Sequence, residues 1–551
     1  MKFNKTKIAL ILSLTIISLG FNFGRTSSAQ VVKRSRVITP TPTPKQTPTP
    51  KQTPAARQTP APTPTPAATP TPPGTQTIFD LQAKIRQILS RPELRRGSVG
   101  VKIVSLDTGK TVFEQDAEKY FMPASNMKSY TVAAALERLT PNFRFVTSVL
   151  ASAPPDAEGV VKGDLTVYGR GDISISYSFY NGDIYRGIDE LADRIAQAGV
   201  KRVEGNLVGD ETFFSGSAIP SGWEWDDLQW YYGAEVSALP LNDNAVNLSV
   251  RPTSQNAPCS VQIQPVNTLY KIVNRCVTSD ARTRRDIRVH KKIGQNILEV
   301  HGTMPVGDAG YTGMITITHP AELFVEMLRQ RLQQKGITVT GRNLVKSEKF
   351  SSLPAPAGQS VEIARLESVP FSVIAAKTMK PSQNLYTETI LWTLGEQVGD
   401  KSNPKLSSAE RGIAVVKDFL QKIGIAPDAV IQYDGSGLSR HNLITPASAV
   451  QLYTYMAKQS PYAAAWENSL TIGGVDGTLR NRFKGTKAEA NMRGKTGTIN
   501  QVSALSGYVT TAAGERMVLS ILVNGVPVTS NRTSAIDAIV VAVANFNGRT
   551  Q

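Results

Sequence analysis

The sequence predicts an α+β protein in which a β-rich region interrupts a mixed domain. Apolar residues with helical spacing occur near both ends, whereas residues 151–350 hold short β-like runs separated by Gly-containing turns. Because helices and strands are segregated along the chain rather than alternating, the α+β class is favoured. The body of about 470 residues exceeds what one core usually serves, so we expect two or more domains.

The charge of the chain is concentrated in its first part. The 551 residues carry a formal charge of +17, and residues 1–79 contain ten basic and no acidic side chains. The remaining 51 basic and 44 acidic side chains are an ordinary balance for a soluble protein. The high charge therefore does not indicate nucleic-acid binding, and no nucleic-acid partner is expected.

Residues 1–29 have the layout of a secretory signal peptide. Three lysines precede the apolar run 8–19, and Ser27-Ser28-Ala29 offers small residues for cleavage after Ala29. The alternative is an uncleaved anchor, although the run is shorter than the ~20 apolar residues of a membrane helix. We expect an exported protein, periplasmic or associated with the cell wall, with no stable membrane span after cleavage.

Residues 30–77 form a Pro/Thr-rich linker. Thirteen of the 34 prolines lie in 40–73, where they fix φ and remove backbone donors. Such a segment should be disordered and extended, with a reach on the order of 100 Å. It is either a spacer that lets the body range through a wall layer or an inert arm.

The first part of the mixed domain is expected over 78–150. Residues 78–89 have helical spacing, and the runs 99–105 and 111–113 flank an Asp-Thr-Gly-Lys turn typical of a β-hairpin. A second helix is expected over 125–139, because it opens after one proline and closes before another.

The region 151–350 is predicted to be an inserted accessory region, of one or more domains, rich in strands. It contains one amphipathic helix, at 321–334. Short strands are expected at 165–168, 202–208, 247–251, 287–289 and 314–318.

The chain has two cysteines, Cys259 and Cys276, and both lie in this inserted region. In an oxidising compartment they could close an 18-residue loop, which stabilises by about 3 kcal/mol in the loop-entropy model. The alternative is a pair of free buried thiols.

The second part of the mixed domain is expected over 351–551. Its helices are predicted at 371–397, 407–423, 446–458 and 534–546. Between the last two of these helices, residues 503–510 and 516–523 are predicted to be paired strands.

Three short motifs occur in one order along the chain. They are Ser-Asn-Met-Lys at 125–128, Ser-Gln-Asn at 382–384 and Lys-Thr-Gly at 495–497. The segments 402–405 and 254–256 also fit the first two patterns, but both lie among prolines and turn-forming residues. Each motif is weak alone, so the indication comes from the ordered set.

These residue types suit nucleophilic catalysis by a serine. Ser125 is expected at the first turn of a helix, where unpaired N–H groups favour developing negative charge, and Lys128 falls on the same face. A desolvated Lys near a second cation, here Lys495, has a lowered pKa and can act as base. Ser382 and Asn384 could relay a proton and hold a substrate amide. The alternative is a surface serine near a solvated lysine.

The three motifs in this order resemble the penicillin-binding proteins and serine β-lactamases. The first two serines are 257 residues apart, and this gap is similar to that of the class C low-molecular-mass penicillin-binding proteins, which are D-alanyl-D-alanine carboxypeptidases and endopeptidases. The resemblance spans about 79–546. Further matches lie at 222–227, 232–234, 237–239 and 434–440.

The resemblance implies a β-lactamase/DD-peptidase-like catalytic domain, an antiparallel sheet with helices, carrying the large β-rich insertion. It implies that Ser125 attacks the penultimate D-Ala carbonyl of a peptidoglycan stem peptide and forms an acyl-enzyme, with Lys128 as general base. The oxyanion would lie between the backbone N–H groups of Ser125 and Thr498. β-Lactam antibiotics would act as covalent inhibitors.

The resemblance also implies substrate-binding residues. Lys495 and Thr496, followed by Gly497, would hold the terminal carboxylate of the substrate. Asp172 matches an acidic position that recognises the free amino end of a diaminopimelate side chain. Arg170 departs from the small residue expected beside it, and this departure weakens the match.

Other functions remain as alternatives to a β-lactam-sensitive DD-peptidase. The chain could be a serine β-lactamase-like hydrolase that clears its acyl-enzyme quickly, or a non-catalytic cell-wall-binding module. The balance between carboxypeptidase and endopeptidase activity stays open. No metal or cofactor is expected, because the histidines show no ligand spacing. These histidines are His290, His301, His319 and His441.

Two further features have both a functional and a structural interpretation. The basic run within 282–292 could contact anionic wall polymers, or it could be a solvated face. Asp434 and Arg440 could shape the site through a turn, or the turn could be purely structural.

Overall fold

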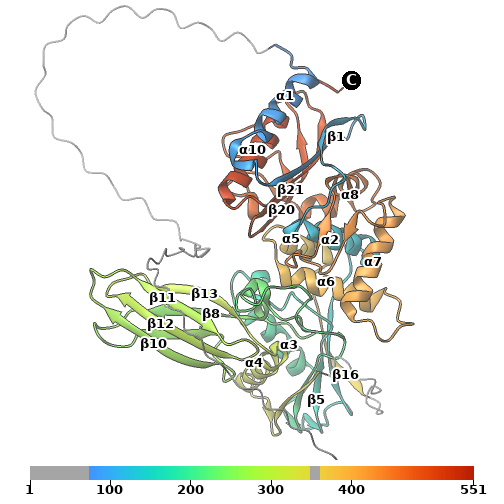
Figure 1. The fold of residues 1–551 in the computed structure, drawn as a ribbon. Helices are drawn as coiled ribbons and strands as arrows, with labels where there is room; N and C mark the ends of the chain where they lie inside the picture. Colours follow the sequence, from blue (N-terminus) through green and yellow to red (C-terminus); the bar gives the residue numbers. More distant parts are fainter. Residues whose placement is uncertain (1–73, 348–359, 551) are drawn as a thin grey trace, which may run out of the picture. The chain divides into compact units, whose positions relative to one another are not determined.

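The computed structural model describes residues 74–347 and 360–550 (Figure 1). The predicted signal peptide, and the predicted linker as far as residue 73, lie outside the described residues. The first helix of the described residues is α1 (Ile78–Leu89), which matches the helical spacing of 78–89. Thr77 caps this helix, because its side chain accepts from the backbone N–H of Asp80 while Asp80 accepts from the N–H of Thr77.

The mixed domain, hereafter the body, is built on an antiparallel six-stranded sheet in the order β19-β20-β21-β22-β1-β2. The expected hairpin is confirmed as β1 (Ser98–Ser105) and β2 (Thr111–Gln115). Its first strand pairs with a strand near the other end of the chain, and Val101 lies opposite Ile521. The remaining strands are β19 (Thr471–Ile472), β20 (Arg493–Ile499), β21 (Val502–Thr510) and β22 (Arg516–Asn524).

Both faces of this sheet are covered by helices. In β22, Leu519 and Ile521 belong to the core beneath α1 and α10 (Thr529–Asn545), which lie side by side in Figure 1. Val518 and Leu522 belong to the core on the opposite face, which includes α2 (Met127–Leu139) and α8 (Pro446–Lys458). Because helices cover both faces, β21 and β22 are buried along almost their whole length.

One helix prediction for the body is wrong. Residues 371–397 form two helices, α5 (Phe371–Met379) and α6 (Asn384–Gln397), rather than one. The break holds Pro381, which has no N–H to donate, and Ser382, whose φ of +66° is incompatible with a right-handed helix. The turn between the helices carries the Ser-Gln-Asn motif. The body also contains α7 (Ser408–Lys422), α9 (Ala463–Ser469) and a short pair, β17 (Val430–Ile431) and β18 (Leu443–Ile444).

The inserted region contains a five-stranded sheet in the order β15-β7-β5-β3-β16. The two helices α3 (Arg186–Gln197) and α4 (Pro320–Gln334) belong to the core on this sheet. Two of its strands, β3 (Val146–Ala151) and β16 (Val361–Glu367), reach beyond the 151–350 expected from the sequence. The other strands are β5 (Leu165–Tyr168), β7 (Leu207–Asp210) and β15 (Asn343–Lys346).

Three smaller sheets complete the inserted region. A disulfide between Cys259 and Cys276, with Cα atoms 5.3 Å apart, joins two of them. Their strand orders are β14-β6-β4, β13-β8-β9 and β10-β12-β11. The strands are β4 (Val160–Lys162), β6 (Arg202–Glu204), β8 (Ala245–Arg251), β9 (Ser260–Gln264), β10 (Lys271–Ser279), β11 (Asp286–Lys291), β12 (Ile297–Pro305), β13 (Tyr311–Thr316) and β14 (Thr338–Val339).

The basic run in the inserted region is largely paired with acidic side chains. Arg285 lies 3.1 Å from Asp308, and Lys291 is buried and donates to the hydroxyl of Thr318. Further ion pairs join Arg282 to Asp280, Arg288 to Asp286 and Lys292 to Glu299. Within residues 74–347 and 360–550, no helix is both long and apolar enough to cross a membrane.

Candidate active site

Ser125 lies in a single 3₁₀ turn, Ala124–Asn126, that leads directly into α2. This turn packs against two glycines. A Cβ atom on Gly497 of β20 would come within 2.4 Å of the Pro123 carbonyl oxygen, and one on Gly437 within 1.8 Å of the Ala124 carbonyl oxygen. Gly437 also has a φ of +81°. Only glycine at these positions lets the two segments approach the serine so closely.

Lys128 is fully buried one turn after Ser125. Its Nζ donates to Ser125 Oγ at 3.0 Å, to Asn384 Oδ1 at 2.6 Å and to the Ser436 carbonyl oxygen at 2.7 Å. Three acceptors from three segments therefore fix the amine beside the hydroxyl.

The pKa of Lys128 is lowered to about 7, and burial is the main cause. The carboxylates of Asp434 and Glu388 act in the opposite direction. The sequence predicted a lowered pKa for this lysine from a nearby second cation, whereas here burial is what lowers it. At neutral pH a large fraction of Lys128 is a neutral amine that can accept a proton.

The second motif joins the two lysines of the site. Lys495 Nζ donates to Ser382 Oγ at 2.9 Å and to the Thr496 carbonyl oxygen at 2.8 Å. Asn384 opens α6, accepts from Lys128 and donates to the Tyr232 carbonyl oxygen at 2.8 Å. Ser382 thus lies beside one amine and Asn384 beside the other.

The third motif lies in β20, the second strand of the sheet. Lys495, Thr496 and Gly497 are buried in β20, whereas Thr498 is exposed. The Thr496 hydroxyl donates to Thr478 Oγ1 at 2.7 Å. The predicted residues of all three motifs therefore meet, with an exposed residue at the open side.

Sequence reasoning missed Glu388 and the carbonyl of Ser436. The Glu388 carboxylate accepts from the backbone N–H groups of Gly435 at 2.9 Å and Ser436 at 2.8 Å, and so fixes the carbonyl that binds Lys128. Burial, followed by the charge of Asp434, raises the pKa of Glu388 to about 8. Glu388 lies four residues after Asn384 in α6, and this shared helix face was the signal available in the sequence.

The turn containing Asp434 is tightly hydrogen-bonded. The Asp434 carboxylate accepts from the backbone N–H groups of Gly437 and Ser439, both at 2.7 Å, and from Trp223 Nε1 at 2.9 Å. Arg440 pairs with Glu224 at 2.6 Å. These hydrogen bonds hold the turn itself in place. The turn also places the Ser436 carbonyl oxygen beside Lys128.

Asp172 lies in the inserted region, in the loop after β5, and its hydrogen bonds within the described residues go to Ser174 and not to a motif residue. One carboxylate oxygen accepts from the Ser174 N–H at 2.9 Å and hydroxyl at 2.6 Å, while the other has no hydrogen-bond partner among the described residues. The side chain is 1% exposed, and burial raises its pKa to about 6. The Arg170 guanidinium donates to Ser148 Oγ and lies over the Tyr168 ring.

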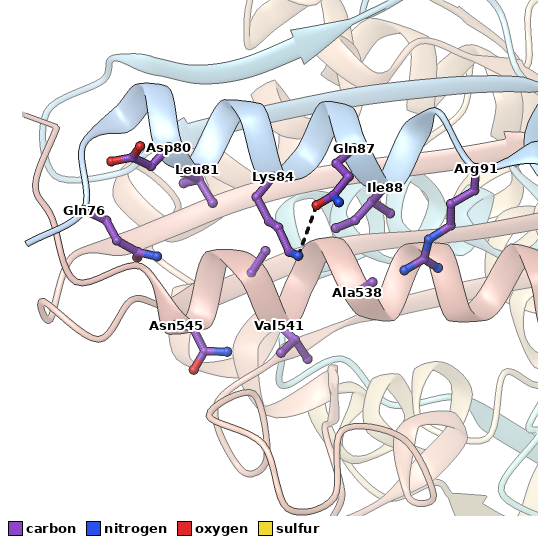
Figure 2. A pocket seen from close by; sticks show the side chains of 11 residues that line it. Gln76, Asp80, Leu81, Lys84, Gln87, Ile88, Arg91, Ala538, Val541 and Asn545 are labelled. Carbon is purple, nitrogen blue, oxygen red and sulfur yellow. Dashed lines mark hydrogen bonds between the residues drawn. The ribbon is translucent and has the colours of Figure 1, made fainter. Parts of the chain in front are cut away.

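A separate groove lies between α1 and α10 (Figure 2). Leu81 and Ile88 of the first helix and Val541 of the second line it, and Lys84 bonds Gln87 along its wall. No motif residue lines the groove, so it is not part of the serine site. Across the described ranges, no group of three His, Cys, Asp or Glu side chains is placed to hold a metal ion.

Solved structures confirm the expected fold. A penicillin-binding protein 4 (dacB) from Haemophilus influenzae matches with a TM-score of 0.71 and 22% identity, over 84% of this chain and 99% of that one. The same protein complexed with a β-lactam matches with a TM-score of 0.65. The catalytic domain therefore has the β-lactamase/DD-peptidase-like fold with an extra β-rich region.

Sequence comparisons agree with this fold. A D-alanyl-D-alanine carboxypeptidase of Actinomadura sp. (strain R39) is 32% identical over 457 residues, 81% of this chain and 81% of the relative. The D-alanyl-D-alanine carboxypeptidase DacB of Haemophilus influenzae is 26% identical over 441 residues, 79% of this chain and 87% of the relative. Residues 81–546 match the D-Ala-D-Ala carboxypeptidase 3 (S13) family. With its three motifs joined around Ser125, the chain belongs to this family, that of the class C low-molecular-mass penicillin-binding proteins.

Proposed function

We propose that the protein is an exported serine DD-peptidase that cleaves the D-alanyl-D-alanine end of peptidoglycan stem peptides and is acylated by β-lactams. The observation that carries this proposal is the buried Lys128 amine, 3.0 Å from Ser125 Oγ and with a pKa lowered to about 7. The relatives named D-alanyl-D-alanine carboxypeptidases support the substrate class. The predicted signal peptide supports export.

Acylation begins with proton transfer from Ser125 to Lys128. The neutral amine accepts the hydroxyl proton while Oγ forms a bond to the carbonyl carbon of the penultimate D-Ala. The negative charge that develops on the carbonyl oxygen is stabilised by the backbone N–H groups of Ser125 and Thr498, and losing such a donor typically costs ~3 kcal/mol of barrier. The position of Gly497 against the Ser125 N–H is compatible with this pairing.

The leaving group departs when the carbon–nitrogen bond breaks and the nitrogen gains a proton. The proton that Lys128 took from Ser125 passes to this nitrogen by way of the Ser382 hydroxyl, which Lys495 holds at 2.9 Å, and Lys128 is neutral again. Lys495 and Thr496 also bind the terminal carboxylate of the substrate, and a β-lactam carboxylate occupies the same place. Water then attacks the acyl carbon and gives a proton to Lys128. As the bond between this carbon and Ser125 Oγ breaks, Lys128 returns the proton to Oγ, which restores the free enzyme.

Asp172 extends the site toward the side chain of the stem peptide. Its unpaired carboxylate oxygen, in a buried setting, is suited to a cationic partner such as the free amino group of diaminopimelate. Pairing with an ammonium would offset the burial that now raises the pKa of this carboxyl.

Covalent labelling tests the proposal. Fluorescent penicillin is expected to label the wild-type protein, and Ser125→Ala should abolish both labelling and release of D-Ala from muropeptides. Ser402→Ala is the matched control, because Ser402 begins the second Ser-x-x-Lys sequence but lies in a surface turn, bonded to Asp400. Undiminished labelling of Ser125→Ala would refute the nucleophile, and an unlabelled wild-type protein would refute the function.

Two further measurements define the activity. Mass spectrometry of digested cross-linked muropeptides separates carboxypeptidase from endopeptidase products. A penicilloyl adduct that turns over within seconds would instead favour a β-lactamase-like hydrolase. Labelling without any D-Ala release or cross-link cleavage would favour a wall-binding module.

A further inference from the structure

A strained segment of the inserted region lies beside the catalytic motifs. Asn242, Asp243 and Asn244 have φ angles of +48°, +62° and +50°, although none is glycine. Left-handed backbone at such residues costs on the order of 1–3 kcal/mol each and persists where the surroundings over-determine it. The run is nevertheless buried, and Asp243 is only 2% exposed.

The Asp243 carboxylate has a full set of hydrogen-bond donors. One oxygen accepts from Tyr386 OH at 2.5 Å and Ser176 Oγ at 2.7 Å, and the other from Gln383 Nε2 at 2.8 Å and Tyr177 OH at 3.1 Å. Four donors account for the acceptor capacity of one carboxylate. A buried carboxylate with all its hydrogen bonds made is costly to disturb, because removing one partner leaves a buried polar group unpaired.

These donors come from the two segments that the proposed function needs. Gln383 is the middle residue of the second motif, and Tyr386 follows in α6. Ser176 and Tyr177 follow Asp172 in its loop. Tyr386 OH also contacts Ser178 Oγ at 2.8 Å, so the loop and the helix meet directly around the carboxylate.

The second motif depends on a backbone turn that needs holding in place. Ser382 has a φ of +66° and accepts from Lys495, while Asn384, two residues on, accepts from Lys128. A shift of the Gln383 side chain would displace Ser382 from Lys495 and Asn384 from Lys128 together. Misplacement by about 1 Å can cost ~10²-fold in rate.

We propose that Asp243 is a positioning residue of the inserted region, which holds the Ser382–Asn384 turn and the Asp172 loop in register through one buried carboxylate. Its carboxylate is bonded to Gln383 and Tyr386, and it acts on Ser382 and Asn384 through these two residues. The inference rests on the proposed function and adds that the insertion takes part in acylation as well as in substrate selection.

The first test is Asp243→Asn, which keeps the size of the side chain and removes its charge. Its amide nitrogen can no longer accept from two of the four donors. We expect the second-order rate constant for acylation by benzylpenicillin to fall roughly 10–100-fold. The loss of kcat/KM on a stem peptide with a free side-chain amine should be larger, because the Asp172 loop is released as well.

Glu326→Gln is the matched control. Glu326 is a buried carboxylate in α4 of the same inserted region. It accepts from the Thr268 N–H at 2.9 Å and hydroxyl at 3.0 Å, and neither bond involves a motif residue. This variant should change the thermal transition without changing acylation. If it slows acylation as much as Asp243→Asn does, general loosening explains the effect and the proposal is overturned.

A double-mutant cycle with Gln383→Leu tests the route. Gln383→Leu removes the donor to Asp243 and leaves Ser382 and Asn384 in the sequence. The two changes should be non-additive, with the double variant acylated about as slowly as the slower single variant. Additive losses would overturn the proposed route. If Asp243→Asn is acylated at the wild-type rate, the inference fails while the labelled wild-type protein still upholds the function.

Discussion

The surroundings of Lys128 and of Asp172 show two ways of burying a charge. Lys128 is surrounded by three oxygen acceptors, all supplied by the protein. Asp172 is equally buried, but one of its carboxylate oxygens has no hydrogen-bond partner among the described residues. Buried polar groups normally have hydrogen-bond partners, so this oxygen needs a physical explanation.

The difference indicates a division of work between the catalytic body and the inserted region. Around Lys128 the hydrogen bonds are complete before any ligand arrives, and this preorganisation suits bond-making. Around Asp172 one carboxylate oxygen has no partner among the described residues, which suits the substrate selection that we propose for it. Asp243, whose four donors come from both regions, lies where the two meet.

The largest expected effect comes from removing the amine. Lys128→Met keeps an unbranched side chain and should lower the acylation rate constant about 10²–10⁴-fold, the usual contribution of a general base. In the wild type, the rate should rise with pH through about 7 and then level off, because the neutral amine is the base. Stopped-flow acylation by penicillin between pH 5 and 9 measures both.

The control for this change is Lys405→Met, in the second Ser-x-x-Lys sequence. Lys405 is exposed, so this variant should keep the wild-type rate and pH profile. A wild-type profile that stays flat across pH 7 would contradict Lys128 as the base.

An intermediate effect is expected at Asp172. Asp172→Asn should lower kcat/KM roughly 10–100-fold for a stem peptide with a free side-chain amine, since a hydrogen bond to a charged group is worth about 1.5–3 kcal/mol. Acylation by penicillin, which carries no such amine, should stay at the wild-type rate. Equal losses on both substrates would remove the distinction between the two regions.

The same variant should alter the pH dependence of stability. Because the pKa of Asp172 is raised to about 6 in the folded state, the native protein holds a proton between about pH 4 and 6 that the unfolded chain releases. Wild-type stability due to this group therefore falls as pH rises through that window. From pH 4 to pH 8, the free energy of unfolding of Asp172→Asn should therefore rise relative to that of the wild type, by on the order of a few kcal/mol. Thermal melts at the two pH values measure this difference.

The smallest effect on activity is expected from the disulfide. Replacing Cys259 and Cys276 together by serine should lower the free energy of unfolding of the inserted region by about 3 kcal/mol. Neither residue bonds a motif residue, so penicillin acylation at room temperature should be unchanged. Calorimetry and labelling on the same sample test both statements, and a labelling defect in a folded variant would contradict them.

Local patterns predicted most of the elements and the members of the serine site. Helical spacing predicted α4 and α8, the Asp-Thr-Gly-Lys turn between two short runs predicted the β1–β2 hairpin, and the ordered motifs predicted which residues meet around Ser125. These features depend on neighbours within a few residues, or on a resemblance that the motif residues carry.

The features that the sequence did not reveal depend on distant partners. Glu388 is bonded to backbone N–H groups 47 and 48 residues away. Asp243 is bonded to donors 140 residues away, in the turn before α6, and 143 residues away, in α6. The break at Ser382 was missed because apolar spacing continues on both sides of it. A proline and the need of the motif for a turn overrode that spacing.

The pairing of β1 with β22 has a consequence for how the molecule is made. Val101 is matched with Ile521, about 420 residues further along the chain. At a synthesis rate of ~5–20 residues per second, the first hairpin therefore waits ~20–80 s for the strand beside it. All strands of the inserted region have been synthesised well before then. The insertion can therefore fold ahead of the body, and a chain interrupted before β22 has no central sheet on which to assemble the serine site.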